Sequence, residues 1–184
     1  MRKIAAGLFM SLDGVVEAPH RWTGPYWSDE LSQGMEEGLK AADAILIGKD
    51  TYLEFADLWG PRGDSSPMAA FLNNTPKYVV SSTLTEAGLK WPEATLVRGD
   101  VVARIKELKS GTGGNIQVPG SPRLVRWLIE QRLLDDLAVC VAPVVVGEGH
   151  RLFDDVGGQI PLELKGSRVL PKGVLGAEYG PADA

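Results

Sequence analysis

The alternation of apolar and amphipathic stretches restricts the fold of this chain more than any other feature. Short apolar runs rich in β-branched residues alternate with amphipathic stretches of helical length as far as Leu137, and only strand-like runs follow that residue. Such alternation is typical of an α/β domain, in which helices connect parallel strands. The ending made of strands alone predicts antiparallel pairing there, and hence a mixed sheet.

We expect eight strands and five helices, and the Pro- and Gly-rich pieces between them are short enough to be loops. A single domain that covers residues 1–184 is therefore predicted. The expected strands are 3–11, 44–48, 77–82, 94–97, 115–118, 136–146, 162–170 and 174–180. The expected helices are 29–41, 50–57, 68–73, 101–109 and 122–131.

Composition and charge exclude several classes of partner. A formal net charge of −5 disfavours nucleic acid and anionic membranes, because both repel an acidic protein. No apolar run approaches the length of about 18 residues that a membrane span needs. The single cysteine, Cys140, cannot form an internal disulfide, which favours a cytoplasmic location. The two histidines lie in different loops, and no Cys/His spacing is typical of zinc, so no metal site is predicted.

Three of the predicted strands end in glycine or in small hydroxyl residues. These ends carry Gly48, Lys49 and Thr51, then Ser81 and Ser82, and finally Gly120 and Ser121. Turns and helix caps would account for each end taken alone. However, the carboxyl ends of parallel strands meet at one edge of a sheet, where helix N-termini bind anions. The recurrence therefore favours one groove for a ligand with several phosphates, such as a dinucleotide.

The helix that begins at Pro122 has a well-specified start. Proline suits a first helical position, and Ser121 before it is a favoured N-cap. Gly120 has no side chain at this point, which would let a phosphate approach the helix amides.

Two further features lie near the first strand. Asp13 follows that strand and would orient a substrate or relay a proton, although an Asp-Gly pair with Gly14 is equally typical of a tight turn. The next loop carries Trp22 and Trp27, whose rings would either cover a bound substrate or pack on the edge of the sheet.

The ordered set of segments "LIGKDTY", "VVSS", "VPGSPRLVRWL" and "APVVVGEGHRLF" resembles the dihydrofolate reductase-like family over almost the full length. The chain is most similar to the branch that contains the reductase domain of the bacterial riboflavin-biosynthesis bifunctional protein. This resemblance implies a three-layer α/β domain with a mixed, mostly parallel central sheet flanked by helices and an antiparallel C-terminal part. It also implies NADPH as the cofactor, and a homodimer formed through the late strands.

The resemblance assigns parts of the cofactor to individual residues. It implies contacts to the pyrophosphate and the adenosine phosphate from Gly48, Lys49 and Thr51. It implies contacts to the adenine ribose from Ser81 and Ser82. It implies a cradle for the pyrophosphate and the nicotinamide side from Gly120, Ser121, Arg123 and Leu124. Lys49, helped by Arg98 or Arg123, would favour NADPH over NADH, because a 2′-phosphate needs a cation.

The sequence therefore predicts a reductase that transfers hydride from NADPH to a small pterin-like or pyrimidine-like heterocycle or to a carbonyl compound. Folate-reducing members of the family carry a carboxylate on the first helix that binds the pterin, and here only Asp29 or Glu30 could correspond to it. The Cys and His ligands of the zinc deaminase that is fused to the riboflavin-pathway reductase are absent from this chain. These departures disfavour both folate reduction and a riboflavin-pathway role. One alternative is a module of the same fold that binds the nucleotide without turnover. A second is an assembly protein that binds no nucleotide.

Overall fold

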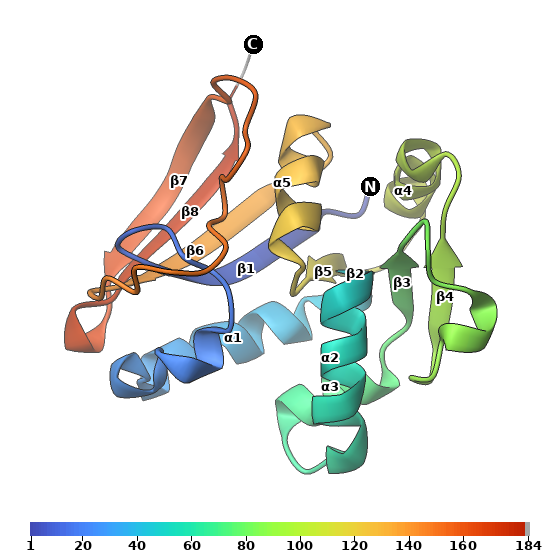
Figure 1. Ribbon diagram of the computed structural model, residues 1–184, viewed down its shortest axis with the longest axis horizontal. Coiled ribbons are helices and arrows are strands. Elements are labelled where there is room, and N and C mark those ends of the chain that lie inside the picture. The colour runs from blue at the N-terminus through green and yellow to red at the C-terminus, as the bar shows by residue number, and fades with distance from the viewer. Residues whose placement is uncertain (183–184) are drawn as a thin grey trace.

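Six parallel strands form most of the eight-stranded sheet in the computed structural model, which describes residues 1–182 (Figure 1). The strands are β1 (Ile4–Ser11), β2 (Ala42–Gly48), β3 (Lys77–Val80), β4 (Ala94–Val97), β5 (Asn115–Val118), β6 (Asp136–Ala142), β7 (Leu162–Val169) and β8 (Leu175–Pro181). Their order across the sheet is β4-β3-β2-β5-β1-β6-β8-β7. Neighbours among β1–β6 are parallel, whereas β8 is antiparallel to both β6 and β7. The predicted mixed sheet is confirmed.

Helices cover both faces of the sheet and complete the three predicted layers (Figure 1). They are α1 (Asp29–Lys40), α2 (Lys49–Trp59), α3 (Pro67–Asn74), α4 (Val101–Ser110) and α5 (Pro122–Glu130). The largest core lies under α4 and α5, where Ile105 and Leu128 pack on Ile4 and Ile116 of the sheet. On the opposite face, α2 and α3 enclose an aromatic core around Tyr52. None of the helices within residues 1–182 is long and apolar enough to cross a membrane.

Strands β3 and β6 end earlier than predicted, for local chemical reasons. Strand β3 stops at Val80 because Ser81 Oγ accepts hydrogen bonds from the N–H groups of Thr83 and Leu84, which turns the chain. Strand β6 stops at Ala142, before Pro143, which has no N–H to donate to a ladder. The segment after β6 then crosses to the end of β1, where Leu12 N–H donates to Val144 O at 2.8 Å.

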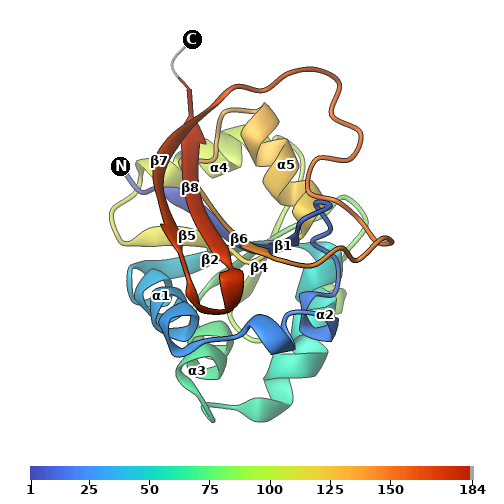
Figure 2. The same ribbon diagram turned by 90° about the vertical axis from the view of Figure 1, so that its left-hand side faces the viewer.

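The β7–β8 hairpin forms one edge of the sheet (Figure 2). A shift of register between Leu164 and Gly166 interrupts the alternation along β7, so that Leu164 and Val169 share one face of the hairpin while Glu163 and Arg168 lie on the other. Leu164 and Val169 are exposed, at 54% and 78%. Leu162, Ala177 and Tyr179 of the same face pack against the core under α5, so the uncovered apolar surface is limited to the part of the face around Leu164 and Val169.

Candidate functional site

The sheet brings the predicted site segments to one edge. Gly48 is the last residue of β2, and Asp13, Ser81 and Gly120 follow the ends of β1, β3 and β5. These four strands are parallel. Their carboxyl ends therefore open toward the same side of the domain. The proximity expected from the sequence is present in the fold.

The loops after β2 and β5 touch through two glycines. Gly48 N–H donates to Gly120 O at 3.2 Å. A Cβ atom on Gly48 would lie 2.5 Å from Ser121 Oγ, and one on Gly120 would lie 2.9 Å from Thr51 Oγ1. Gly120 also has a φ of +154°, which other residues rarely adopt. The fold itself therefore requires both glycines, and the reason given by the sequence for Gly120, room for a phosphate, is not the only one.

Two helices begin at this contact without a side-chain cap. Ser28, Ser66 and Asp100 accept hydrogen bonds from the first turns of α1, α3 and α4. By contrast, Gly48 before α2 has no side chain. Ser121 occupies the predicted N-cap position before α5, but its side chain makes no capping hydrogen bond. The N-terminal N–H groups of a helix carry partial positive charge and need acceptors. The ends of α2 and α5 therefore suit an anionic ligand.

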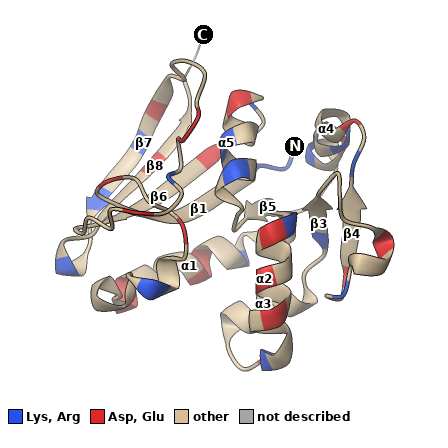
Figure 3. Ribbon diagram, in the orientation of Figure 1, with Lys and Arg blue, Asp and Glu red and all other residues tan. Residues whose placement is uncertain are grey.

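Figure 3 shows a basic segment at the start of α2. It belongs to Lys49, the first residue of α2, which adds a positive charge there. Its Nζ donates to Thr83 Oγ1 at 3.2 Å and lies 3.7 Å from Asp50 Oδ1. Ser81, in contrast, uses its hydroxyl to hold the turn after β3, and Ser82 is exposed beside it. Lys49 and Ser82 therefore present polar groups at this part of the edge, and Ser81 has a structural task.

The two remaining predicted residues of α5 differ in exposure. Arg123 is exposed on the first turn of the helix. Leu124 is only 6% exposed, and its side chain belongs to the core under α4 and α5. Only the main chain of Leu124 is thus able to face a ligand.

Asp13 holds the loop after β6 against the end of β1. Its carboxylate accepts hydrogen bonds from Ser11 Oγ at 2.6 Å, Val146 N–H at 3.0 Å and Gly147 N–H at 2.8 Å. These hydrogen bonds, led by that from Ser11, hold the pKa of Asp13 well below its ordinary value. A carboxylate that stays ionised is a poor proton donor near neutral pH. The geometry therefore favours a loop-holding role for Asp13 over proton relay.

Glu17 provides a second hold on the same loop, which sequence reasoning missed. Its Oε2 accepts a hydrogen bond from His150 N–H at 2.8 Å, and Val16 N–H donates to His150 O at 2.9 Å. The local sequence around an acidic loop residue does not distinguish a residue that holds another loop from one that is only solvated. Its partner became visible only when the loops after β1 and β6 were placed side by side.

The two tryptophans of the first loop have partners within the protein. Trp27 packs against Phe9 of β1 with ring centroids 5.5 Å apart, and its Nε1 donates to Ser32 Oγ at 2.7 Å. Trp22 Nε1 donates to Glu17 O at 3.1 Å. Trp27 nevertheless remains 39% exposed. The loop is thus anchored on the sheet, with one ring still open to a neighbour.

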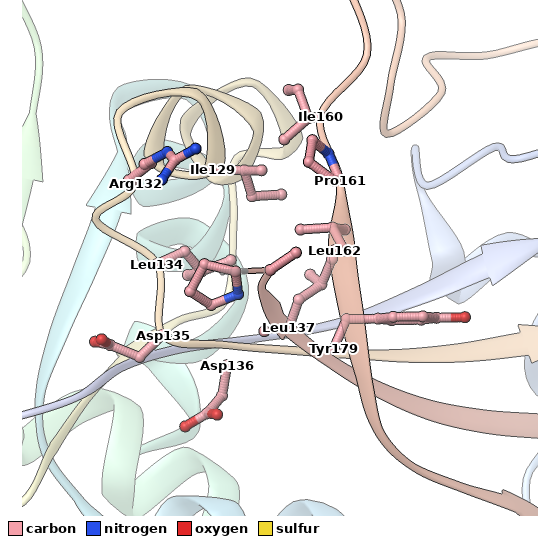
Figure 4. A pocket seen from close by; sticks show the side chains of 13 residues that line it. Ile129, Arg132, Leu134, Asp135, Asp136, Leu137, Ile160, Pro161, Leu162 and Tyr179 are labelled. Atoms are coloured by element: carbon pink, nitrogen blue, oxygen red, sulfur yellow. The ribbon is translucent and has the colours of Figure 1, made fainter. Parts of the chain in front are cut away.

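A separate hollow lies at the opposite edge of the sheet (Figure 4). Its walls come from the end of α5, the start of β6, and strands β7 and β8, and include Ile129, Leu137 and Tyr179. None of the predicted site residues lines it. The hollow is therefore distinct from the glycine contact and its two helix ends.

Comparison with known proteins identifies the family. A family model described as the RibD C-terminal domain matches residues 2–175. The chain belongs to the RibD C-terminal domain family. A relative in this comparison, the uncharacterized protein YyaP of Bacillus subtilis, is 28% identical over 97% of this chain and 94% of its own length.

Solved structures share the fold across the whole chain. A proposed riboflavin biosynthesis protein from Shewanella sp. PV-4 has a TM-score of 0.78 at 20% identity and is covered completely. The diaminohydroxyphosphoribosylaminopyrimidine deaminase/5-amino-6-(5-phosphoribosylamino)uracil reductase of Thermotoga maritima has a TM-score of 0.66 at 16% identity, with 98% of this chain matching 57% of that protein. Dihydrofolate reductase from Enterococcus faecalis, in complex with NADP(H), has a TM-score of 0.65 at 16% identity over 98% of this chain and 97% of its own. The dihydrofolate reductase-like fold is confirmed.

Proposed function

We propose that this protein is an NADPH-dependent reductase that transfers hydride to a small heterocyclic or carbonyl substrate. The observation that carries the proposal is the meeting of two uncapped helix N-termini at the Gly48–Gly120 contact. Family membership and the fold shared with an NADP(H) complex support the same conclusion. NADPH would supply the hydride, and the chain would bind and orient both reactants.

The residues at the carboxyl edge divide the cofactor between them in this proposal. The free N–H groups of α2 and α5 would bind the pyrophosphate, with Gly48, Thr51, Gly120, Ser121 and the main chain of Leu124 beside it. Lys49, with Ser82 and Arg98 or Arg123, would bind the 2′-phosphate end, and Ser81 would shape that end through its turn. A cation is what distinguishes an NADPH site from an NADH site.

The loops after β1 and β6 would form the substrate side. Asp13 would position the loop at Val146 and Gly147, and Trp27 with Trp22 would cover the substrate. The Thermotoga relative is named as a reductase of a substituted uracil, which supports a pyrimidine-like or pterin-like substrate. The alternative is a nucleotide-binding module without turnover. Such a module would bind NADPH but would not oxidise it, whichever acceptor is offered.

We further propose a homodimer in the cytoplasm. Self-association is supported by the exposed apolar side chains of the β7–β8 hairpin, because an exposed apolar patch favours a partner; these are Leu164, Val169 and Leu175. Analytical ultracentrifugation would give the oligomeric state.

The test is thermal unfolding with NADPH, with NADH and without ligand. A ligand that binds only the folded state stabilises it by about 2.7 kcal/mol at a hundredfold excess over Kd, so a clear shift is expected with NADPH and a smaller one with NADH. Lys49→Ala should reduce the NADPH shift toward that of NADH. The matched control is Lys106→Ala, on an exposed face of α4. Absence of a shift with either cofactor would refute the proposal, and a shift without NADPH oxidation across a panel of pterins, pyrimidines and carbonyl compounds would favour the binding module.

A further inference from the structure

The hollow of Figure 4 has apolar walls that come from several segments of the chain. The walls include Ile129 of α5, Leu137 of β6, Leu162 of β7 and Tyr179 of β8. The hollow holds about 420 Å³ of space, which includes its open mouth. Binding sites for small molecules are concave and mostly apolar, with a few polar groups that fix the ligand. This size and lining suit a compact apolar body, such as one ring or a short alkyl chain.

The two carboxylates at the hollow already have cationic partners. Asp135 Oδ2 accepts a hydrogen bond from Lys109 Nζ at 2.6 Å. Asp136 accepts hydrogen bonds from Lys3 Nζ at 3.2 Å and from Lys165 Nζ at 2.5 Å. Both carboxylates point away from the hollow in Figure 4. They therefore add no unbalanced negative charge to it.

Arg132 is the cation that lines the hollow, and it lies beside Ile129 (Figure 4). Within residues 1–182, no ion pair engages its guanidinium. A guanidinium presents its N–H donors in a planar fork that matches the two oxygens of a carboxylate. Next to an apolar hollow, this side chain therefore suits the carboxylate of a ligand whose remainder is apolar.

Arg132 also occupies a backbone position that favours glycine. It follows the C-cap of α5 and has a φ of +53°. Its N–H donates to Ile129 O at 3.0 Å, and Leu133 N–H donates to Leu128 O at 2.9 Å, as is typical of a helix that ends in the left-handed region. Glycine is the usual residue there, because a side chain makes this conformation costly. The helix ending thus gives no reason for arginine, and strained positions of this kind are typical of binding sites.

We propose that the hollow binds a small apolar monocarboxylate, with its apolar body against Leu137 and Leu162 and its carboxylate on Arg132. A carboxylate and a guanidinium form two parallel hydrogen bonds, and the apolar body leaves water as it enters the hollow. One guanidinium balances one negative charge, whereas a phosphate monoester carries about two at neutral pH. The hollow lies at the C-terminal end of α5, and the proposed cofactor groove lies at its N-terminal end. The two sites are therefore separate.

Calorimetric titration of the wild-type protein with phenylacetate and with hexanoate tests the proposal. Both carboxylates should bind. Phenylacetamide has nearly the same shape as phenylacetate without the charge, and it should bind at least tenfold more weakly. Acetate has the charge without the apolar body, and it should give no measurable binding. Absence of binding by phenylacetate and hexanoate, or equal binding of phenylacetate and phenylacetamide, would overturn the proposal.

Arg132→Gly is the variant that separates a ligand role from a structural one. It removes the guanidinium and suits the left-handed backbone, so it should weaken phenylacetate binding at least tenfold without lowering the unfolding temperature of the free protein. Lys172→Gly is the matched control. Lys172 is also an exposed cation, has a φ of +60°, and lies on the turn between β7 and β8, outside the hollow. This control should leave phenylacetate binding unchanged.

Three results with the variants would overturn the assignment. Unchanged phenylacetate binding in Arg132→Gly would place the carboxylate elsewhere. A clear fall in the unfolding temperature of Arg132→Gly would show that arginine serves the fold. Loss of the NADPH thermal shift in Arg132→Gly would join the hollow to the cofactor groove.

A second copy of this chain is the competing occupant of the hollow. If phenylacetate does not bind to the wild-type protein and Arg132→Gly lowers the sedimentation coefficient, the hollow is an interface between copies and the proposal fails. The proposal does not depend on the reductase function. If the wild-type protein binds phenylacetate but shows no NADPH shift, the proposed function fails and the carboxylate site stands.

Discussion

Substitution of Gly120 by alanine should destabilise the protein even without any ligand. The added Cβ would lie 2.9 Å from Thr51 Oγ1 and 3.1 Å from Thr51 Cγ2, both closer than ordinary contacts. Overpacking of this kind costs about 1 to 3 kcal/mol. The φ of +154° adds strain of about 1 to 3 kcal/mol for a residue with a side chain. The expected loss of unfolding free energy is therefore about 2 to 6 kcal/mol when both terms are combined.

Thr51→Ala separates the two terms. It removes both atoms that the new Cβ would meet and leaves Thr51 Cβ at 3.5 Å, an ordinary contact. The double variant Gly120→Ala/Thr51→Ala should thus recover the packing term and retain the backbone strain. A coupling energy of about 1 to 3 kcal/mol is expected from urea unfolding of the four proteins of the cycle.

The double variant distinguishes two reasons for glycine at position 120, which are the contact with Thr51 and access for a phosphate. If no contact with Thr51 required glycine at position 120, Gly120→Ala would cost the free protein only the backbone strain of about 1 to 3 kcal/mol. Thr51→Ala would then rescue nothing. Additive effects of the two substitutions, within about 0.5 kcal/mol, would refute the contact with Thr51 as the reason for glycine at this position.

Two further substitutions test the core and the loop after β6. Tyr52→Phe should lower the unfolding free energy, measured in urea, by about 2 to 4 kcal/mol. The buried Tyr52 hydroxyl accepts a hydrogen bond from Trp91 N–H and donates one to Trp91 C=O, so its loss leaves two buried backbone groups without partners. A loss below about 0.5 kcal/mol would contradict this reasoning. The pKa of Asp13 is lowered from its ordinary value of 3.8. The ionised carboxylate therefore stabilises the fold fully at pH values above that ordinary pKa, and this stabilisation is lost as the pH falls below it. Asp13→Asn should therefore lose part of the acid dependence of unfolding below that pH, measured by circular dichroism, and should speed amide hydrogen exchange at Val146 and Gly147; identical acid transitions in both proteins would exclude the loop-holding role.

Much of the secondary structure and the general position of the site followed from the sequence. Strand and helix periodicity, together with Pro122 and the glycines, located the elements to within two residues, except for the end of β6, which comes four residues earlier than expected. These signals are local, because each depends on residues within a turn or two of the chain. They also placed Gly48 and Gly120 at strand ends that face the same edge.

Only the tertiary structure decided what those residues touch. Thr51 lies against Gly120, Val146 and Gly147 bond to Asp13, and His150 bonds to Glu17, all across large separations in sequence. The sequence thus determined which elements form and at which edge the polar strand ends meet, since short-range sterics and hydrophobic periodicity control both. The partners of each side chain emerged only from the fold, because they depend on the register and packing of segments that are distant along the chain.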